Sequence, residues 1–147
     1  ENDLRSGTSD FPVHVMLAKT LRLAYAGQKD AYENAARLNH ETRKFLIEKP
    51  DLVINSPESG SPFILNFSLL RKKASVVVEA LSLKDIMVSS VSACSSSKFK
   101  ESDVLLAMGA SSPVAGNTIR LSFGKENTLA ELQKFFLAFD ETLQKIR

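Results

Sequence analysis

Residues 118–123, with the sequence TIRLSF, decide the fold of this chain. Apolar and polar side chains alternate along the stretch, and this period of two is that of a β-strand with one buried face. Ile119, Leu121 and Phe123 are expected to face the core. The same alternation turns Arg120 away from the core. The stretch therefore predicts a half-buried strand that presents a guanidinium group on its outer face.

A helix is expected after Gly124, which ends this strand. Thr128 and Glu131 have the spacing of a capping box, in which each side chain accepts a hydrogen bond from the other residue's backbone N–H. Apolar residues then recur at intervals of three and four: Leu129, Leu132, Phe136, Phe139, Leu143 and Ile146. We interpret this stripe as core-facing rather than as a partner zipper, because it is too short for a coiled coil.

Three further strands are expected upstream. Residues 63–69 alternate like 118–123 and predict a second half-buried strand. Its faces carry Phe63, Leu65, Phe67 and Leu69 on one side and Ile64, Asn66 and Ser68 on the other. Short apolar runs predict strands at 52–55 and 86–89. The residues 56–62, rich in Pro, Ser and Gly, predict a loop.

Two helices are expected between these strands. Residues 71–73 open the first, whose body is 74–83. Ser102 is a suitable N-cap for a short helix at 103–108, and Gly109 suits the position after its end. Residues 110–117 are small and are interpreted as a loop.

A long helix is expected at residues 11–48. Asp10 is a suitable N-cap, Pro12 fits a first turn, and Pro50 stops the helix. Gly27 is expected to bend or end it. One apolar face precedes Gly27 and another follows it: Val13, Met16, Leu17, Leu21 and Ala24, then Ala31, Tyr32, Ala35, Leu38, Phe45 and Leu46. Such a helix is too long for the core of one small domain, so we expect it to link two domains.

The predicted fold class is therefore α+β. The element order indicates a two-layer sandwich, in which a small, mainly antiparallel sheet has helices on one side and is preceded by the long linking helix. Hydrophobic residues make up 44% of the 147 residues and charged residues 24%, as in ordinary globular proteins. The formal net charge of +2 is too small to indicate a nucleic-acid partner.

No apolar run approaches the roughly 18 residues that a membrane span requires. The N-terminal residues resemble neither a signal peptide nor a transit peptide, and they lack an initiator Met, so we expect a piece of a longer protein. One cysteine excludes an internal disulfide framework and a thiol-rich metal site, which fits a reducing compartment. No metal site is expected.

That cysteine, Cys94, lies in the serine-rich segment SSVSACSSS at 89–97. Serine side chains compete for backbone hydrogen bonds and favour loops. A single cysteine is often a small buried hydrophobe. In this polar loop we favour the other interpretation, a nucleophile.

Five stretches resemble the C-terminal part of cysteine desulfurases, which are pyridoxal-phosphate enzymes of the class V aminotransferase superfamily. They are LRSGT at 4–8, FILNFS at 63–68, VSSVSACSS at 88–96, VLLAMG at 104–109 and TIRLSFG at 118–124. The long serine-rich loop is similar to that of the longer-loop group. The resemblance covers essentially the whole chain and implies the small domain of a fold-type I enzyme.

The resemblance also implies residue roles. Cys94 corresponds to the sulfur-accepting nucleophile, and Arg120 to the residue that binds the substrate carboxylate. Thr8 corresponds to the threonine that reaches the cofactor phosphate of the neighbouring subunit in a homodimer. Lys98 and Lys100 are candidates for stabilising the Cys94 thiolate.

The chain departs from the family at two points. Val91 stands where the family usually has glycine, which stiffens the loop. No lysine is preceded by histidine, so the family's cofactor-binding lysine is absent from these residues. His14 and His40 match no motif and are interpreted as surface or packing residues.

The resemblance implies a pyridoxal-phosphate-dependent cysteine desulfurase that converts L-cysteine to L-alanine and a persulfide on Cys94. An acceptor protein of iron–sulfur assembly, tRNA thiolation or thiamine synthesis would then take the sulfur. Residues 1–10 would end the large cofactor domain, 11–48 would link the domains, and 49–147 would form the small domain. We expect a cytoplasmic protein with no membrane or direct nucleic-acid partner, and an inactive isolated chain.

A standalone sulfur-carrier or protein-interaction module, with Cys94 loaded by another protein, is the alternative. The reading frame upstream of Glu1 distinguishes the two, because the desulfurase requires a preceding cofactor domain. Another class V enzyme, such as a lyase or a transaminase, is disfavoured by the serine-rich cysteine loop.

Overall fold

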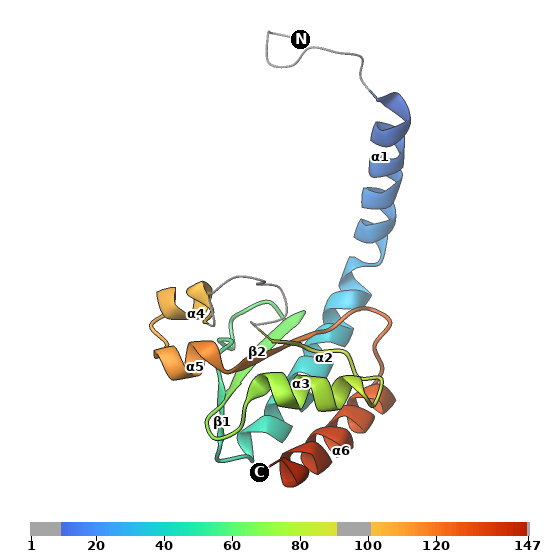
Figure 1. The fold of residues 1–147 in the computed structure, drawn as a ribbon. Helices are drawn as coiled ribbons and strands as arrows, with labels where there is room; N and C mark the ends of the chain where they lie inside the picture. Colours follow the sequence, from blue (N-terminus) through green and yellow to red (C-terminus); the bar gives the residue numbers. More distant parts are fainter. Residues whose placement is uncertain (1–9, 91–100, 147) are drawn as a thin grey trace.

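One antiparallel sheet organises the part of the chain that the structure describes, residues 10–90 and 101–146 of a computed structural model (Figure 1). Its strands are β1 (Leu52–Ile54), β2 (Ile64–Leu69), β3 (Ser89–Ser90) and β4 (Thr118–Ser122). Their order is β1-β2-β4-β3, and each neighbouring pair is antiparallel. The predicted α+β class with a small antiparallel sheet is confirmed.

The register of β2 against β4 gives the sheet one apolar face. Leu65 pairs with Leu121 and Phe67 with Ile119, and all four side chains are buried. Side chains that are directly opposite lie on the same face of an antiparallel pair. The alternation expected at 63–69 and 118–123 is therefore confirmed on this inner face.

Three helices cover the inner face: α2 (Gln28–Ile47), α3 (Ala74–Ser82) and α6 (Leu129–Lys145). The ring of Phe139 in α6 meets that of Phe67 edge-on, with centroids 5.7 Å apart. Phe45 of α2 stacks on Phe136 of α6 at 4.1 Å. The core-facing stripe expected in α6 is confirmed at Leu132 and Phe139, whereas Leu129 is 37% exposed. The buried surface of α6 also includes Phe135, so it is broader than the sequence pattern indicated.

Gly27 divides the predicted long helix into α1 (Phe11–Ala26) and α2. The Asp10 side chain caps α1 by accepting a hydrogen bond from the backbone N–H of Val13, as expected. Figure 1 shows α1 extending away from the sheet and the other helices. No residue of α1 is buried among the described residues, and Met16 is 68% exposed. Leu38 of α2, in contrast, is buried in the core.

Two short helices, α4 (Asp103–Ala107) and α5 (Ser112–Gly116), pack together beside the outer face of the sheet (Figure 1). Ser102 caps α4 as expected, and Gly109 follows it with a φ of 87°, a conformation that favours glycine. The prediction of a loop at 110–117 is wrong. Pro113 fits the first turn of α5, and the small, fully buried Ala115 lets the helix pack closely.

The strand expected at 86–89 is also wrong in its position, because among the described residues Ser89 and Ser90 pair with β4 whereas 86–88 do not. Asp85, with a φ of 59°, reverses the chain after α3, and the N–H of Ile86 donates to the carbonyl of Leu81. The side chains of Ile86 and Val88 pack against the core. Their apolar character therefore serves packing rather than strand pairing.

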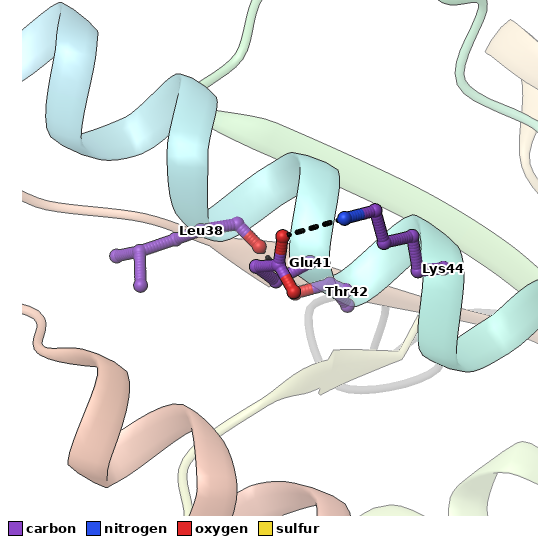
Figure 2. A network of polar contacts seen from close by, with 4 residues as sticks. All are labelled: Leu38, Glu41, Thr42 and Lys44. Carbon is purple, nitrogen blue, oxygen red and sulfur yellow. Dashed lines mark hydrogen bonds and ion pairs between the residues drawn. The ribbon is translucent and has the colours of Figure 1, made fainter.

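Buried threonines in two core helices differ in their hydrogen bonding. Figure 2 shows that Thr42 of α2 donates from Oγ1 to the carbonyl oxygen of Leu38, at 2.7 Å. Glu41 and Lys44 form an ion pair of 3.0 Å in the same helix (Figure 2). Thr142 of α6 is equally buried, but its Oγ1 has no partner among the described residues. A buried hydroxyl without a partner has lost its hydration without compensation.

Replacing Thr142 with valine should therefore stabilise the chain. Thr142→Val removes the unpaired hydroxyl and keeps the branched shape, so the free energy of unfolding should rise by about 1 kcal/mol. The matched control Thr42→Val removes a satisfied hydroxyl and should lower it by about 1 kcal/mol. Urea unfolding measures both. A Thr142→Val protein that is less stable than the parent would contradict this account.

The capping box of α6 should make stability depend on acid pH. The backbone N–H of Thr128 donates to Glu131 at 2.8 Å, and this bond holds the pKa of Glu131 below its usual value. Because the pKa of Glu131 is lower in the folded chain than in the unfolded chain, its ionised carboxylate stabilises the fold. This stabilisation is present above about pH 4.5, the usual pKa, and is lost as the pH falls through the pKa of the folded state.

Glu131→Gln should accordingly show a smaller loss of stability than the parent between about pH 6 and about pH 3 in urea unfolding. The exposed loop variant Glu58→Gln is the control and should follow the parent. Parallel pH profiles for Glu131→Gln and the parent would show that the capping carboxylate does not contribute.

Candidate functional site

A cavity of about 410 Å³ lies on the outer face of the sheet, where α4 approaches β2 and β4. Asn66, Thr118 and Arg120 contribute its polar wall. Val104, Leu105 and Met108 contribute an apolar wall. Ser89 and Ser90 of β3 also line it. The cavity therefore joins both central strands to the strand that leads into the serine-rich segment.

Arg120 supplies the charge of this cavity. Its side chain is exposed on the outer face of β4, as expected from the alternation at 118–123. Among the described residues that line the cavity, no other carries a charge, and no described carboxylate forms an ion pair with Arg120. An unpaired guanidinium beside an apolar wall is suited to a carboxylate ligand, which it can bind with two parallel hydrogen bonds.

A hydrogen-bonded polar layer underlies the cavity on the same face. Asn55 Nδ2 donates to Asn66 Oδ1 and to Ser68 Oγ, both at 2.7 Å. Ser68 Oγ donates to the carbonyl oxygen of Val114 in α5, at 2.8 Å. Thr118 Oγ1 donates to Asn66 Oδ1 at 2.6 Å. These bonds connect the end of β1 to β2, and β2 to both β4 and α5. They therefore position the strands that carry the site.

Burial on the outer face exceeds what the sequence indicated. Ser68 is 0% exposed and Thr118 is 2% exposed, although alternation alone placed both on the outer side of half-buried strands. The α4–α5 segment covers them. Asn66 and Ser68 occupy successive outward-facing positions of β2. These two polar residues were the signal in the sequence that could have indicated a buried polar layer, because polar groups that become buried require partners.

The structure describes one of the three predicted site residues. Arg120 lines the cavity. Cys94 and Thr8 lie outside the described residues, as do Val91, Lys98 and Lys100. His14 on α1 and His40 on α2 are exposed among the described residues.

The cavity residues suit a substrate carboxylate better than pyridoxal phosphate itself. None of the described lining residues is lysine, the residue type that forms the cofactor's Schiff base. Nor do His, Cys, Asp and Glu residues cluster into a possible metal site within 10–90 and 101–146. Over the same residues, no helix is long and apolar enough to cross a membrane.

A second cavity of about 520 Å³ is larger, and its charged lining residues include Asp85 and Lys134. It lies between residues 84–88, the end of β4 and the start of α6. Lys84 lines it but already pairs with Glu141, at 2.7 Å. Glu131 lines it and is engaged in the capping box. The smaller cavity is the better candidate site, because Ser89 and Ser90 of β3, which lead into the serine-rich segment, line it together with Arg120.

Comparison with known proteins identifies the family. The model of the family described as Aminotransferase class-V matches residues 1–135. The chain belongs to the class-V aminotransferase family. This membership confirms the predicted resemblance at the level of the superfamily.

Curated relatives of the chain include a protein that is named as a cysteine desulfurase. A "NifS/IcsS protein homolog" of Lactobacillus delbrueckii subsp. bulgaricus is 36% identical over 98% of this chain and 38% of its own length. "Cysteine desulfurase IscS" of Anaeromyxobacter dehalogenans is 34% identical over 100% of the chain and 36% of its own length. The chain therefore spans little more than a third of the curated relatives it matches.

Solved structures that resemble the chain have the same fold. A protein titled "NIFS-LIKE PROTEIN" superimposes with a TM-score of 0.79 at 28% identity, covering 96% of this chain and 36% of the other. The cysteine desulfurase CsdA from Escherichia coli superimposes with a TM-score of 0.70 at 21% identity, covering 98% and 33%. The second likeness concerns the fold alone.

Ser68→Ala should destabilise the chain, because it removes one of the two hydrogen bonds of the Asn55 amide and one of the two that the Val114 carbonyl accepts. A hydrogen bond contributes about 0.5–1.5 kcal/mol, so the loss of two should lower the free energy of unfolding by about 1–3 kcal/mol. Ser59→Ala in the exposed loop is the control and should change it by less than about 0.5 kcal/mol. Equal stabilities of the two variants in urea would show that the polar layer contributes nothing.

Proposed function

We propose that this chain is the C-terminal part of a pyridoxal-phosphate-dependent cysteine desulfurase. The observation that carries the proposal is the unpaired Arg120 in a cavity that β3 also lines. Cys94 follows Ser90 by four residues, and four residues span at most about 14 Å. A carboxylate-binding group and a thiol are therefore available to one substrate. Relatives named "Cysteine desulfurase IscS" support this assignment.

Arg120 is proposed to hold the substrate L-cysteine by its carboxylate. Its planar guanidinium offers parallel N–H donors to the two carboxylate oxygens, which defines the direction of the substrate as well as its position. The apolar wall at Val104 and Met108 limits competing water around the substrate.

Cys94 is the proposed nucleophile. Its thiolate attacks the substrate sulfur, so that a sulfur–sulfur bond forms as the substrate carbon–sulfur bond breaks. The electron pair of the broken bond remains on carbon, which takes up a proton and becomes the methyl group of L-alanine. The Cys94 sulfur is oxidised to a persulfide, and the substrate carbon is correspondingly reduced. No further oxidant is required.

Pyridoxal phosphate, when bound, would supply the electron sink for this bond cleavage. We assign its covalent attachment to residues outside this chain, since no described lysine lines the cavity. Thr8 is proposed to reach the cofactor phosphate of the partner subunit in a homodimer. The persulfide would pass to an acceptor protein in the cytoplasm, of iron–sulfur assembly or of a thiolation pathway.

The domain division is part of the proposal. Residues 1–10 would end a large cofactor domain, 11–48 would connect it to the rest, and 49–147 would form the small domain. The exposure of the apolar side chains of α1, including Met16 and Leu21, supports a covering domain there. The buried residues of α2 belong to the core of the described body, so the second half of the connection is rigidly joined to it.

Cys94→Ala in the full-length protein tests the nucleophile. The variant should release less than about 1% of the parent's alanine from L-cysteine and form no persulfide, because an alanine side chain cannot accept sulfur. Its cofactor absorbance should be unchanged. Alanine analysis and thiol labelling followed by mass spectrometry measure these quantities.

The neighbouring variant Ser92→Ala is the matched control, since it alters the same segment without removing the thiol. It should keep persulfide formation within about threefold of the parent. Desulfurase activity that survives in Cys94→Ala would refute the assignment of the nucleophile.

A further inference from the structure

The polar layer determines which way the Asn66 amide is oriented. The carbonyl oxygen of Val114 can only accept, so the hydroxyl hydrogen of Ser68 is committed to it, at 2.8 Å. Ser68 Oγ must then accept from Asn55, which therefore presents its NH₂ group. The same NH₂ group lies 2.7 Å from the Asn66 side chain. Asn66 must meet it with its carbonyl oxygen, Oδ1.

This orientation leaves the donor end of Asn66 unused. Oδ1 already accepts hydrogen bonds from Asn55 and Thr118. The two N–H groups on Nδ2 have no hydrogen-bond partner within the described residues. Asn66 is directly opposite Arg120 in the β2–β4 register, and both line the 410 Å³ cavity. Such cross-strand neighbours have Cβ atoms roughly 5 Å apart.

We propose that Asn66 is a second substrate-binding residue: its Nδ2 group and the Arg120 guanidinium together hold the carboxylate of the amino-acid substrate. A carboxylate has about four lone-pair positions, so it can accept two bonds from Arg120 and one more from an amide. This inference rests on the proposed function, because that function supplies the amino-acid substrate.

The arrangement also gives a reason for the polar layer. A free asparagine side chain can rotate to present either end of its amide. Here the hydrogen bonds from Val114 through Ser68 to Asn55, together with the bond from Thr118, hold Oδ1 toward Asn55 and Thr118. The Nδ2 group of Asn66 therefore stays directed toward the ligand. Binding then requires no reorientation of the amide, and the site discriminates against ligands without a carboxylate.

The test uses the full-length holoenzyme and two ligands that differ only in the carboxylate, L-alanine and ethylamine. Binding is followed through the cofactor absorbance, and the KM for L-cysteine is measured in parallel. Asn66→Leu keeps a similar volume and removes the donors. It should weaken L-alanine binding and raise KM by roughly 10- to 150-fold, the range for a lost hydrogen bond to a charged group. Ethylamine binding should stay within about twofold.

Asn34→Leu is the matched control, because it makes the same substitution at an asparagine of α2 that does not line the cavity. It should change L-alanine binding by less than about threefold. If Asn66→Leu does not fold, Asn66→Ser replaces it. The serine hydroxyl can accept from the same neighbours but is too short to reach the ligand, so it should show the same selective loss.

Equal weakening of L-alanine and ethylamine, or unchanged L-alanine binding in the Asn66 variants, would overturn the inference. A parent protein that forms no persulfide from L-cysteine would instead overturn the proposed function. In that case the L-alanine and ethylamine comparison still decides the role of Asn66.

Discussion

The antiparallel pairing of β2 with β4 is the constraint on which the rest of this structure depends. Side chains in a strand alternate between faces, so one register decides both faces at once. Pairing Leu65 with Leu121 directs the apolar residues toward the helices and Asn66 and Arg120 toward the cavity. A slip of one residue in β4 would turn Arg120 toward the core helices, and the same slip in β2 would turn Asn66 there, so the core and the cavity depend on the same register.

The outer face of the sheet carries a buried polar layer beneath the cavity. Ser68 and Thr118 are covered by the α4–α5 segment, and their hydroxyls are satisfied by named partners. Such a layer is costly to leave incomplete, because an unpaired polar group in a low-dielectric environment has no compensation. The layer therefore holds the neighbouring Asn66 and Arg120 positions rigidly. Rigid support of this kind is what a binding site requires for specificity.

The family comparisons agree with the contrast between α1 and α2. The class-V family model matches residues 1–135, and the chain spans little more than a third of its curated relatives. Helix α2 contributes buried residues to the core, whereas α1 contributes none among the described residues. An amphipathic helix usually gains its stability from packing its apolar face. The exposed apolar face of α1 is thus the strongest support for the large cofactor domain that we propose.

The sequence by itself determined the α+β class, the alternation in β2 and β4, the capping box of α6 and the outward direction of Arg120. Each of these features depends on local periodicity or on a short hydrogen-bonded motif. The tertiary structure alone decided the rest. It showed that Ile86 and Val88 pack without pairing, that 112–116 form α5, and that Ser68 and Thr118 are buried. It also oriented the Asn66 amide. These features depend on contacts between residues up to about 50 positions apart, such as Ser68 with Val114, and no local pattern encodes which distant segment will cover a strand.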